Sequence, residues 1–306
     1  MRETPMVLST TTTILSRWDA VPPRENLLKS MRLCAQAGFE HLDLHFGTQG
    51  QEGFPLAMDG WEKWVDEAAE EAFRLHVTFR QAHAFHYRTR ESTAPLDNRP
   101  WYEERMRRSV LAAERLGVKW LVQHPSDFDA DPAYDFEKAR AYNIAYWTPF
   151  VELASRHHVG VAFENLYASG HHQRYCSEVD ELIDLIDAFK GAPVGACWDT
   201  GHAAVAGQDQ PAAIRKLGSR LHALHIHDNH RLPKGDEHLM PYCGTLDWDR
   251  IYRALADVAY EGNFSFEIKH ATRDLPPELC EGMLSFMRQL GQYMVGRVVA
   301  ERGSHA

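Results

Sequence analysis

The fold of this chain is decided by VGVAFENLY (residues 159–167), VGACWDTGHA (194–203), LHALHIHDN (221–229) and NFSFEIKH (263–270). Each stretch begins as a short apolar run, typical of a buried parallel strand, and ends in polar residues. Small or polar residues alternate with bulky apolar ones along each run, which is the period of a strand. Four polar residues share the small face: Glu164, Asp199, His225 and Glu267. Because the bulky face must meet outer helices, we expect the polar face to point inward.

The same pattern extends outward along the chain. Four further strand-like runs lie at residues 6–13, 39–47, 75–85 and 118–127. Stretches with the apolar spacing of amphipathic helices separate the runs, for example at 25–38, 61–75 and 101–117. Eight strand and helix units predict a single-domain (β/α)8 TIM barrel over residues 1–306, with 302–306 as a tag remnant or disordered tail. The first run lacks a following GxGxxG turn, which argues against a dinucleotide-binding fold.

Length and composition limit the function classes. A chain of 306 residues with 44% hydrophobic residues suits one barrel. Its net charge of −10 repels a phosphate backbone and argues against nucleic acid as a partner. The sequence contains neither an apolar run long enough to span a membrane nor the apolar segment of a signal peptide. Its five widely spaced cysteines predict a reduced, cytoplasmic setting.

The four inward polar residues predict a metal site at the barrel mouth. Active sites of such barrels lie at the carboxyl ends of the strands, where these residues fall. Any one of them alone is readily explained as a paired or hydrogen-bonded core residue. If all four were buried without a bound cation, desolvation and mutual repulsion would cost several kcal/mol for each side chain. A divalent cation removes that cost, and oxygen and nitrogen ligands suit Mn, Zn, Mg or Co.

Further polar residues lie near the other strand ends. His83 and His124 end the third and fourth runs, and His202 follows Asp199 by three residues. Asp236 and His238 lie in the loop after the seventh run. Because His83 and His124 belong to earlier strands, we expect them to lie away from the four-residue cluster.

The motifs FENL, WDTGH, HIHDN and FEIK resemble those of the xylose isomerase-like barrel superfamily, in particular its sugar phosphate isomerase/epimerase branch. The resemblance covers essentially the whole chain. In ketose 3-epimerases of this group, two glutamates, one aspartate and one histidine bind a single metal. The resemblance assigns these roles to Glu164, Asp199, His225 and Glu267. It also implies that substrate is held by His202 and Arg231, and we extend this role to His227, His238, His83 and His124.

A rival branch shares the scaffold. Barrels that cleave DNA at abasic sites bind three zinc ions, and the resemblance implies that a second or third metal would use His83, His124, His202, Asp236 and His238. The seventh loop departs from the family pattern, because Pro241-Tyr242-Cys243-Gly244 replaces a Pro-Gly-Glu-Gly stretch. The added Tyr242 suggests a more apolar pocket. We expect one metal rather than several.

The leading hypothesis is a metal-dependent isomerase or epimerase, or a dehydratase or lyase, that acts on a sugar, keto-sugar or polyol derivative. Proton transfer next to a carbonyl would pass through an enediolate, with Glu164 and Glu267 as base and acid. One alternative is a multinuclear zinc phosphodiester hydrolase. The other is a barrel that binds a sugar without catalysis. The sequence allows homo-oligomers.

Overall fold

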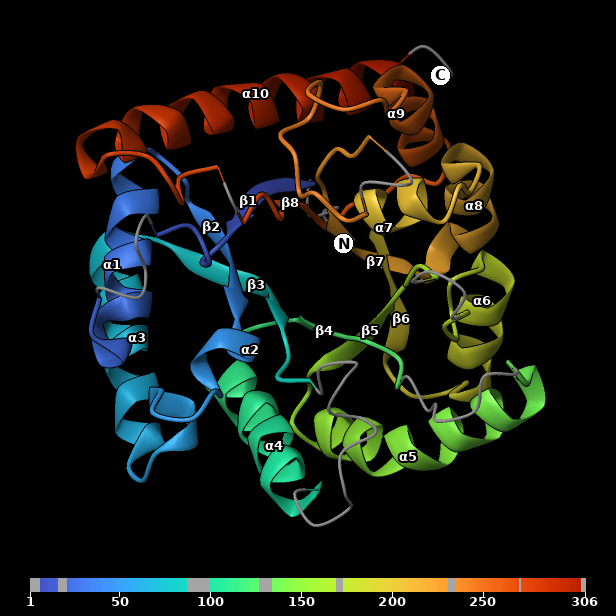
Figure 1. Ribbon diagram of the computed structural model, residues 1–306, viewed down its shortest axis with the longest axis horizontal. Helices are drawn as coiled ribbons and strands as arrows, with labels where there is room; N and C mark the ends of the chain where they lie inside the picture. Colours follow the sequence, from blue (N-terminus) through green and yellow to red (C-terminus); the bar gives the residue numbers. More distant parts are fainter. Residues whose placement is uncertain are drawn as a thin grey trace.

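Eight parallel strands form a ring that is enclosed by helices in the computed structural model (Figure 1). The structure describes residues 6–15, 21–86, 99–126, 134–168, 173–230, 235–269 and 271–303. The strands are β1 Val7–Thr11, β2 His41–His45, β3 Thr78–His83, β4 Trp120–Gln123, β5 Gly160–Glu164, β6 Val194–Asp199, β7 Leu221–His225 and β8 Asn263–Phe266. The predicted (β/α)8 TIM barrel is confirmed.

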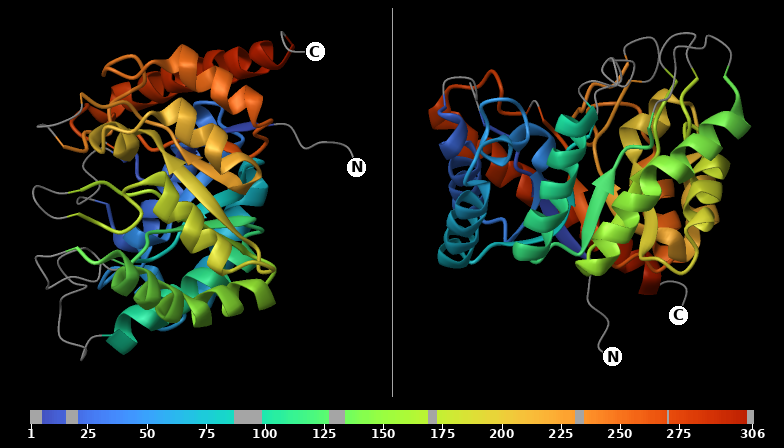
Figure 2. Two further views of the ribbon diagram at one scale, coloured as in Figure 1. Left: turned by 90° about the vertical axis from the view of Figure 1, so that its right-hand side faces the viewer. Right: turned by 90° about the horizontal axis from the view of Figure 1, so that it is seen from below.

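Neighbouring strands pair in the order β7-β6-β5-β4-β3-β2-β1-β8. The ring closes between the end of β7 and β8, where Ile226 N donates to Ser265 O at 2.7 Å and Glu267 N donates to Ile226 O at 3.1 Å. Because the strands are parallel, their carboxyl ends lie at one end of the barrel, the upper end in the right-hand view of Figure 2. The closing bonds place Glu267 directly beside the end of β7.

The helices form the outer layer. Those that cover the barrel are α1 Pro23–Gln36, α3 Trp61–Leu75, α4 Arg99–Arg115, α5 Phe136–Arg156, α6 Val179–Ala188, α8 Gln210–Leu217, α9 Trp248–Asp257 and α10 Pro277–Gly303. Short α2 Phe46–Gln49 and α7 Thr200–Val205 directly follow β2 and β6 at the barrel mouth. The long α10 lies along β1 and β8 (Figure 1).

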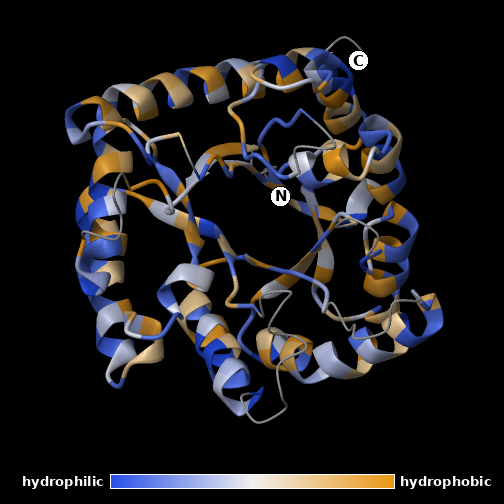
Figure 3. Ribbon diagram, viewed as in Figure 1, coloured by the Kyte–Doolittle hydropathy of each residue, from blue (hydrophilic) through white to orange (hydrophobic). Residues whose placement is uncertain are grey.

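The two faces of the strands separate as their alternation predicts. Inside the barrel, small residues make a fully buried layer of Val122, Ala162, Cys197 and Ala223. Bulky neighbours on the opposite face, such as Phe163, Trp198 and Ile226, belong to the main hydrophobic core. Hydrophobic and hydrophilic residues follow one another in bands along the helices (Figure 3), and buried helix residues such as Leu27, Trp64 and Val110 belong to the same core. The barrel interior therefore has room for polar side chains at its carboxyl end.

Two glycines allow large rings to fill the amino end of the barrel. A Cβ atom at Gly160 would collide with the Trp120 ring, and one at Gly195 with the His222 ring. These two rings stack with centroids 3.9 Å apart. Aromatic packing thus closes the end of the barrel opposite the polar residues.

The strands are shorter than the sequence runs that predicted them. Leu75 is the last residue of helix α3 and does not begin β3. The helix ends there because the next residue, His76, adopts the left-handed conformation of a C-cap. At the carboxyl ends, Phe46 and Thr200 already belong to short helices. None of the helices in the described ranges has the length and apolarity needed to cross a membrane.

Candidate metal centre

Four side chains meet where β5 to β8 end. Glu164 and Asp199 are the last residues of β5 and β6, His225 is the last of β7, and Glu267 follows β8 directly. Each is at most 3% exposed. One ligand atom from each lies within 4.8 Å of those of the other three. We call this set of four residues the carboxylate cluster.

The ring of His225 lies at the centre of this cluster. Its Nδ1 atom is 2.8 Å from Glu164 Oε1, 3.7 Å from Glu267 Oε2 and 3.9 Å from Asp199 Oδ2. Burial would lower the pKa of His225, but the neighbouring Cys197 and the surrounding carboxylates raise it well above its ordinary value. Without a metal ion, His225 is therefore the cation that balances these carboxylates.

Burial and charge act against each other on the two glutamates. Burial alone would raise the pKa of Glu164, yet His225 and His124 hold it well below its ordinary value. Burial would likewise raise the pKa of Glu267, which Lys269 and His225 hold well below the usual range. Both glutamates are thus ionised, which is the form in which a carboxylate binds a metal or accepts a proton.

Asp43 on β2 lies behind His225, on the side away from the cluster. Its Oδ2 atom is 3.3 Å from His225 Nε2 and accepts hydrogen bonds from Gln81 Nε2 at 2.6 Å and Ser265 Oγ at 2.8 Å. This carboxylate holds the Nε2–H of His225 and turns Nδ1 toward the cluster. Asp43 was not predicted as a site residue; its polarity inside a buried strand was the available signal.

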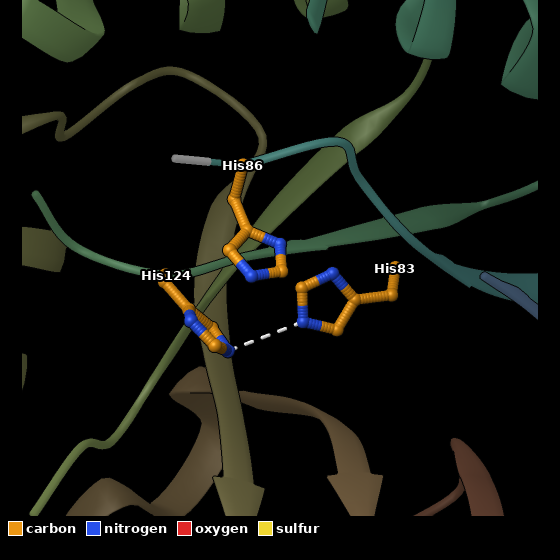
Figure 4. Close-up of side chains that lie close together, drawn as sticks. All are labelled: His83, His86 and His124. Carbon is orange, nitrogen blue, oxygen red and sulfur yellow. Dashed lines mark hydrogen bonds between the residues drawn. The ribbon is translucent and has the colours of Figure 1, made fainter. Parts of the chain in front are cut away.

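Three histidines from β3 and β4 form a second group, shown in Figure 4. His83 Nε2 and His124 Nε2 lie 3.2 Å apart, and the His86 ring lies 4.4 Å from the His124 ring and 4.8 Å from the His83 ring. Their ring nitrogens are close enough to share a metal ion. We call His83, His86 and His124 the imidazole cluster. His86, three residues after His83, escaped the sequence prediction.

The two clusters touch, so the expectation that His83 and His124 lie away from the other ligands is wrong. Glu164 Oε2 is 3.0 Å from His124 Nε2 and 3.4 Å from His83 Nε2. The physical reason is the ring order of the strands, which places β4 beside β5 and so brings His124 to Glu164. One glutamate therefore faces both groups.

Two members of the imidazole cluster, His86 and His124, are held neutral by their surroundings. Burial lowers the pKa of His124 to about 4, although Glu164 acts in the opposite direction. Burial and the neighbouring histidines lower the pKa of His86 well below its ordinary value. Neutral imidazole is the form that binds a metal or accepts a hydrogen bond.

Asp236 joins two of the predicted residues on the other side of the mouth. Its Oδ2 atom is 2.9 Å from His238 Nε2 and 3.5 Å from His202 Nε2. Burial would lower the pKa of His202, but Asp199, Asp236 and Glu164 raise it to about 10. His202 is therefore a cation. His238 also reaches the carboxylate cluster, with Nδ1 3.6 Å from Glu267 Oε2.

His227 is fixed beneath Asp199. Its Nε2 atom lies 2.9 Å from Asp199 Oδ1 and 3.0 Å from Oδ2. Its ring occupies the space that a Cβ atom at Gly201 would need. His227 is fully buried. Its contacts with both carboxylate oxygens orient Asp199 in the same way that Asp43 orients His225.

Two further predicted features have different outcomes. Arg231, which the resemblance assigned to substrate, lies outside the described residues. Tyr242, whose presence in the seventh loop suggested a more apolar pocket, has its hydroxyl 2.6 Å from that of Tyr252 on α9. Its loop is anchored by Asp228, which accepts a hydrogen bond from Tyr242 N at 3.0 Å.

A cavity of about 620 Å³ opens beside these clusters. His45, His83, His124 and Lys269 are among the residues that line it. The last of these was missed as a site residue, and its Nζ atom lies 2.8 Å from Glu267 Oε1. The cavity is large enough for a small organic substrate that reaches both clusters.

The chain is similar to several known proteins. The family described as Xylose isomerase-like TIM barrel matches residues 31–290. An uncharacterised protein of Sinorhizobium fredii is 26% identical over 263 residues, which cover 79% of this chain and 81% of that protein. A D-psicose 3-epimerase of Enterocloster bolteae is 32% identical over 117 residues, which cover 34% of this chain and 36% of that enzyme.

The solved structure of an L-ribulose 3-epimerase superposes with a TM-score of 0.76 at 13% sequence identity, covering 98% of both chains. At that identity the likeness concerns the fold.

Proposed function

The chain belongs to the xylose isomerase-like TIM barrel family, and we propose on that premise that it is a divalent-metal-dependent isomerase or epimerase. Its substrate would be a sugar, keto-sugar or polyol derivative. A dehydratase or lyase would begin with the same proton transfer. The D-psicose and L-ribulose 3-epimerases named above, whose names describe sugar epimerisation, support this choice of chemistry.

The observation that carries the proposal is the donor set of the carboxylate cluster. Three carboxylates and one imidazole, nearly or fully buried, converge within 4.8 Å. So many acidic groups at such spacing fit a hard or borderline divalent ion, for which we propose Mn, Zn, Mg or Co. Glu164, Asp199, His225 and Glu267 would hold it. When bound, the ion would polarise the substrate carbonyl and its neighbouring hydroxyl.

Proton transfer would be the task of the two glutamates. Both are ionised in the buried site, so either can accept a proton from the carbon next to the carbonyl. Lys269, 2.8 Å from Glu267 Oε1, keeps that carboxylate charged and distinguishes it from Glu164. The second glutamate would return a proton to the enediolate. Return at the other face of the same carbon gives an epimer, and return at the neighbouring carbon gives an isomer.

Histidines would orient the substrate hydroxyls. The cationic His202 and the partly buried His124 both contact Glu164, and their ring centroids lie 6.1 Å apart. A cationic donor beside a neutral imidazole would bind neighbouring hydroxyls in one direction. We extend this role to His83 and His238, and to Arg231.

Isotope exchange tests the proposal. The metal-loaded protein is incubated in D2O with a panel of ketoses, and NMR follows deuterium at the carbons next to the carbonyl. We expect deuterium incorporation and a new sugar, with at least 100-fold less exchange in Glu164→Gln. If a folded protein loaded with each of the four ions exchanges no proton of any ketose, the proposal is wrong.

A multinuclear zinc hydrolase is the second candidate, because Glu164 contacts two residues of the imidazole cluster. A second ion would there use His83, His124 and Glu164, and a third would use His202, Asp236 and His238. Hydrolysis of a phosphodiester with two or three ions per chain would favour this candidate. Binding of a sugar without exchange would instead favour a non-catalytic barrel. A cytoplasmic location and homo-oligomers remain predictions.

A further inference from the structure

The lining of the cavity beside the candidate metal centre includes two chemically different groups. His83, His124 and Lys269 line it and contact Glu164 or Glu267 of the carboxylate cluster. Phe85, Trp101 and Tyr102 also line it and pack on one another. A ligand that fills the whole cavity must therefore have a polar head and a part with an apolar face.

The aromatic residues of the cavity form a preorganised wall. The rings of Trp101 and Tyr102 lie 5.0 Å apart edge to face, and the Phe85 ring lies 5.8 Å and 5.9 Å from them. The guanidinium of Arg105 lies 3.7 Å from the Trp101 ring centroid and donates to the Trp101 carbonyl at 2.8 Å. This cation supports the indole through a cation–π contact.

The aromatic wall is open to a ligand. Trp101 and Tyr102 remain partly exposed, whereas Phe85 is 5% exposed beneath them. Phe85 is itself fixed, because its backbone N–H donates to the buried Ser109 Oγ at 3.1 Å. Rigid, partly exposed aromatic faces bind ring ligands at little entropic cost.

Polar groups from the β2–α3 segment also line the cavity. Thr48, Gln51 and Glu52 belong to its lining together with the aromatic residues. A pyranose has the matching surface, since its C–H face packs on an aromatic ring while its edge carries hydroxyls. A volume of about 620 Å³ falls in the range of drug-sized ligands rather than of a single small sugar.

We propose that the substrate is a glycosylated keto-sugar, whose carbonyl-bearing unit lies at the candidate metal centre and whose attached sugar ring packs on Phe85, Trp101 and Tyr102. This inference rests on the proposed function for the reacting unit. The attached ring requires the aromatic wall and the polar groups that line the same cavity. An aryl substituent shares the flat apolar face but lacks the hydroxyl edge.

Paired substrates test this inference. Deuterium exchange is measured with metal-loaded protein on D-fructose, on the glucosyl-fructoses maltulose and isomaltulose, and on 6-O-benzyl-fructose. We expect kcat/KM for one glucosyl-fructose to exceed that for fructose about tenfold or more. Trp101→Ala should remove this preference and leave exchange on fructose unchanged, while Trp101→Phe should keep most of it. Phe73→Ala on the outer surface, where Phe73 is 83% exposed, is the matched control.

Equal or better exchange on fructose would overturn the inference while leaving the proposed function intact. Equal loss on both substrates in Trp101→Ala would overturn it too, as would a clear preference for the benzyl derivative. If no sugar exchanges, the proposed function fails, and saturation-transfer NMR with cellobiose and glucose then tests the aromatic subsite alone. Cellobiose binding that depends on Trp101 would support the subsite, and its absence would overturn it.

Discussion

The two clusters at the barrel mouth contain similar residues in opposite electrostatic states. The carboxylate cluster has three acids around His225, whose pKa is raised well above its ordinary value by them despite burial. The imidazole cluster has three rings, and burial lowers the pKa of His124 to about 4. Glu164 contacts both.

The difference shows how strand position decides the chemistry of a histidine. At the end of β7, a histidine faces Glu164 on one side and Asp43 on the other and is held as a cation. Beyond the ends of β3 and β4, His86 and His124 face other histidines, so burial and the neighbouring imidazoles lower their pKa values and keep them neutral. The first arrangement offers a charged donor set that fits a divalent ion, and the second offers neutral imidazoles for hydrogen bonds or metal binding.

Removal of metal should give the largest effect, because the carboxylate cluster is proposed to work through its ion. Treatment with a chelator should reduce isotope exchange to background, and a divalent ion should restore it. Elemental analysis of the untreated protein should find at least one divalent ion per chain. A metal-free protein that is active, and stays active in chelator, would contradict the role of this cluster.

The substitution Glu267→Gln should have the second largest effect on activity. One oxygen ligand survives this change while the proton acceptor is lost, so we expect about 10²–10⁴-fold lower turnover with the fold and some metal retained. Steady-state rates, metal content and circular dichroism check this. Glu278→Gln on the surface of α10 serves as the control. Near wild-type turnover would remove Glu267 from the acid/base pair.

Asp43→Asn should weaken metal binding by about 10–100-fold, since the amide no longer fixes the ring of His225. Competition with a chelating dye measures the affinity, and ¹⁵N NMR of the imidazole reports its tautomer. Ser265→Ala is the matched control, because it removes one hydrogen bond to Asp43 Oδ2 and keeps the charge. Equal metal affinity in wild type and Asp43→Asn would show that His225 needs no such support.

His83→Ala and His124→Ala decide whether the imidazole cluster binds metal. With one ion per chain, both variants should keep the stoichiometry near one and mainly raise KM, because they lose hydrogen bonds to substrate. With two or three ions, each variant should release a metal. We favour the first outcome. Both histidines contact Glu164, a proposed ligand of the first ion. The measurement therefore also tests whether Glu164 is shared between two ions.

The smallest expected effect is on the stability of the metal-free protein. His202, with a pKa raised to about 10, contributes stability that is fully present below pH 6.5 and is lost as the pH rises toward 10. His124, with a pKa lowered to about 4, reduces stability as the pH falls from 6.5 toward 4. At about 1.4 kcal/mol per pKa unit, these shifts correspond to about 5 kcal/mol for His202 and about 3 kcal/mol for His124.

Urea unfolding across the pH range, after chelation, measures this effect. His202→Gln should flatten the alkaline limb of the stability profile and leave the acid limb. His124→Gln should do the reverse. Two variants with the same profile would mean that the clusters do not differ in charge as described.

The sequence by itself determined the barrel and the inward side of each strand. Strand alternation and helix periodicity are local properties, so they can be recognised in one segment of sequence without knowing which other segments pack against it. They sufficed to place Glu164, Asp199, His225 and Glu267 on one face. Strand ends were less certain, because whether Phe46 or Thr200 continues a strand or starts a helix depends on the loop that receives it.

Tertiary structure alone decided which polar residues meet across the barrel. Asp43 on β2 contacts His225 on β7, and a register shift between Leu42 and Asp43 accompanies its place in the sheet. The same closure puts His86 into the imidazole cluster and makes Glu164 common to both groups. Such contacts depend on the order, tilt and register of the closed strands, and these are set by packing between segments far apart in the sequence.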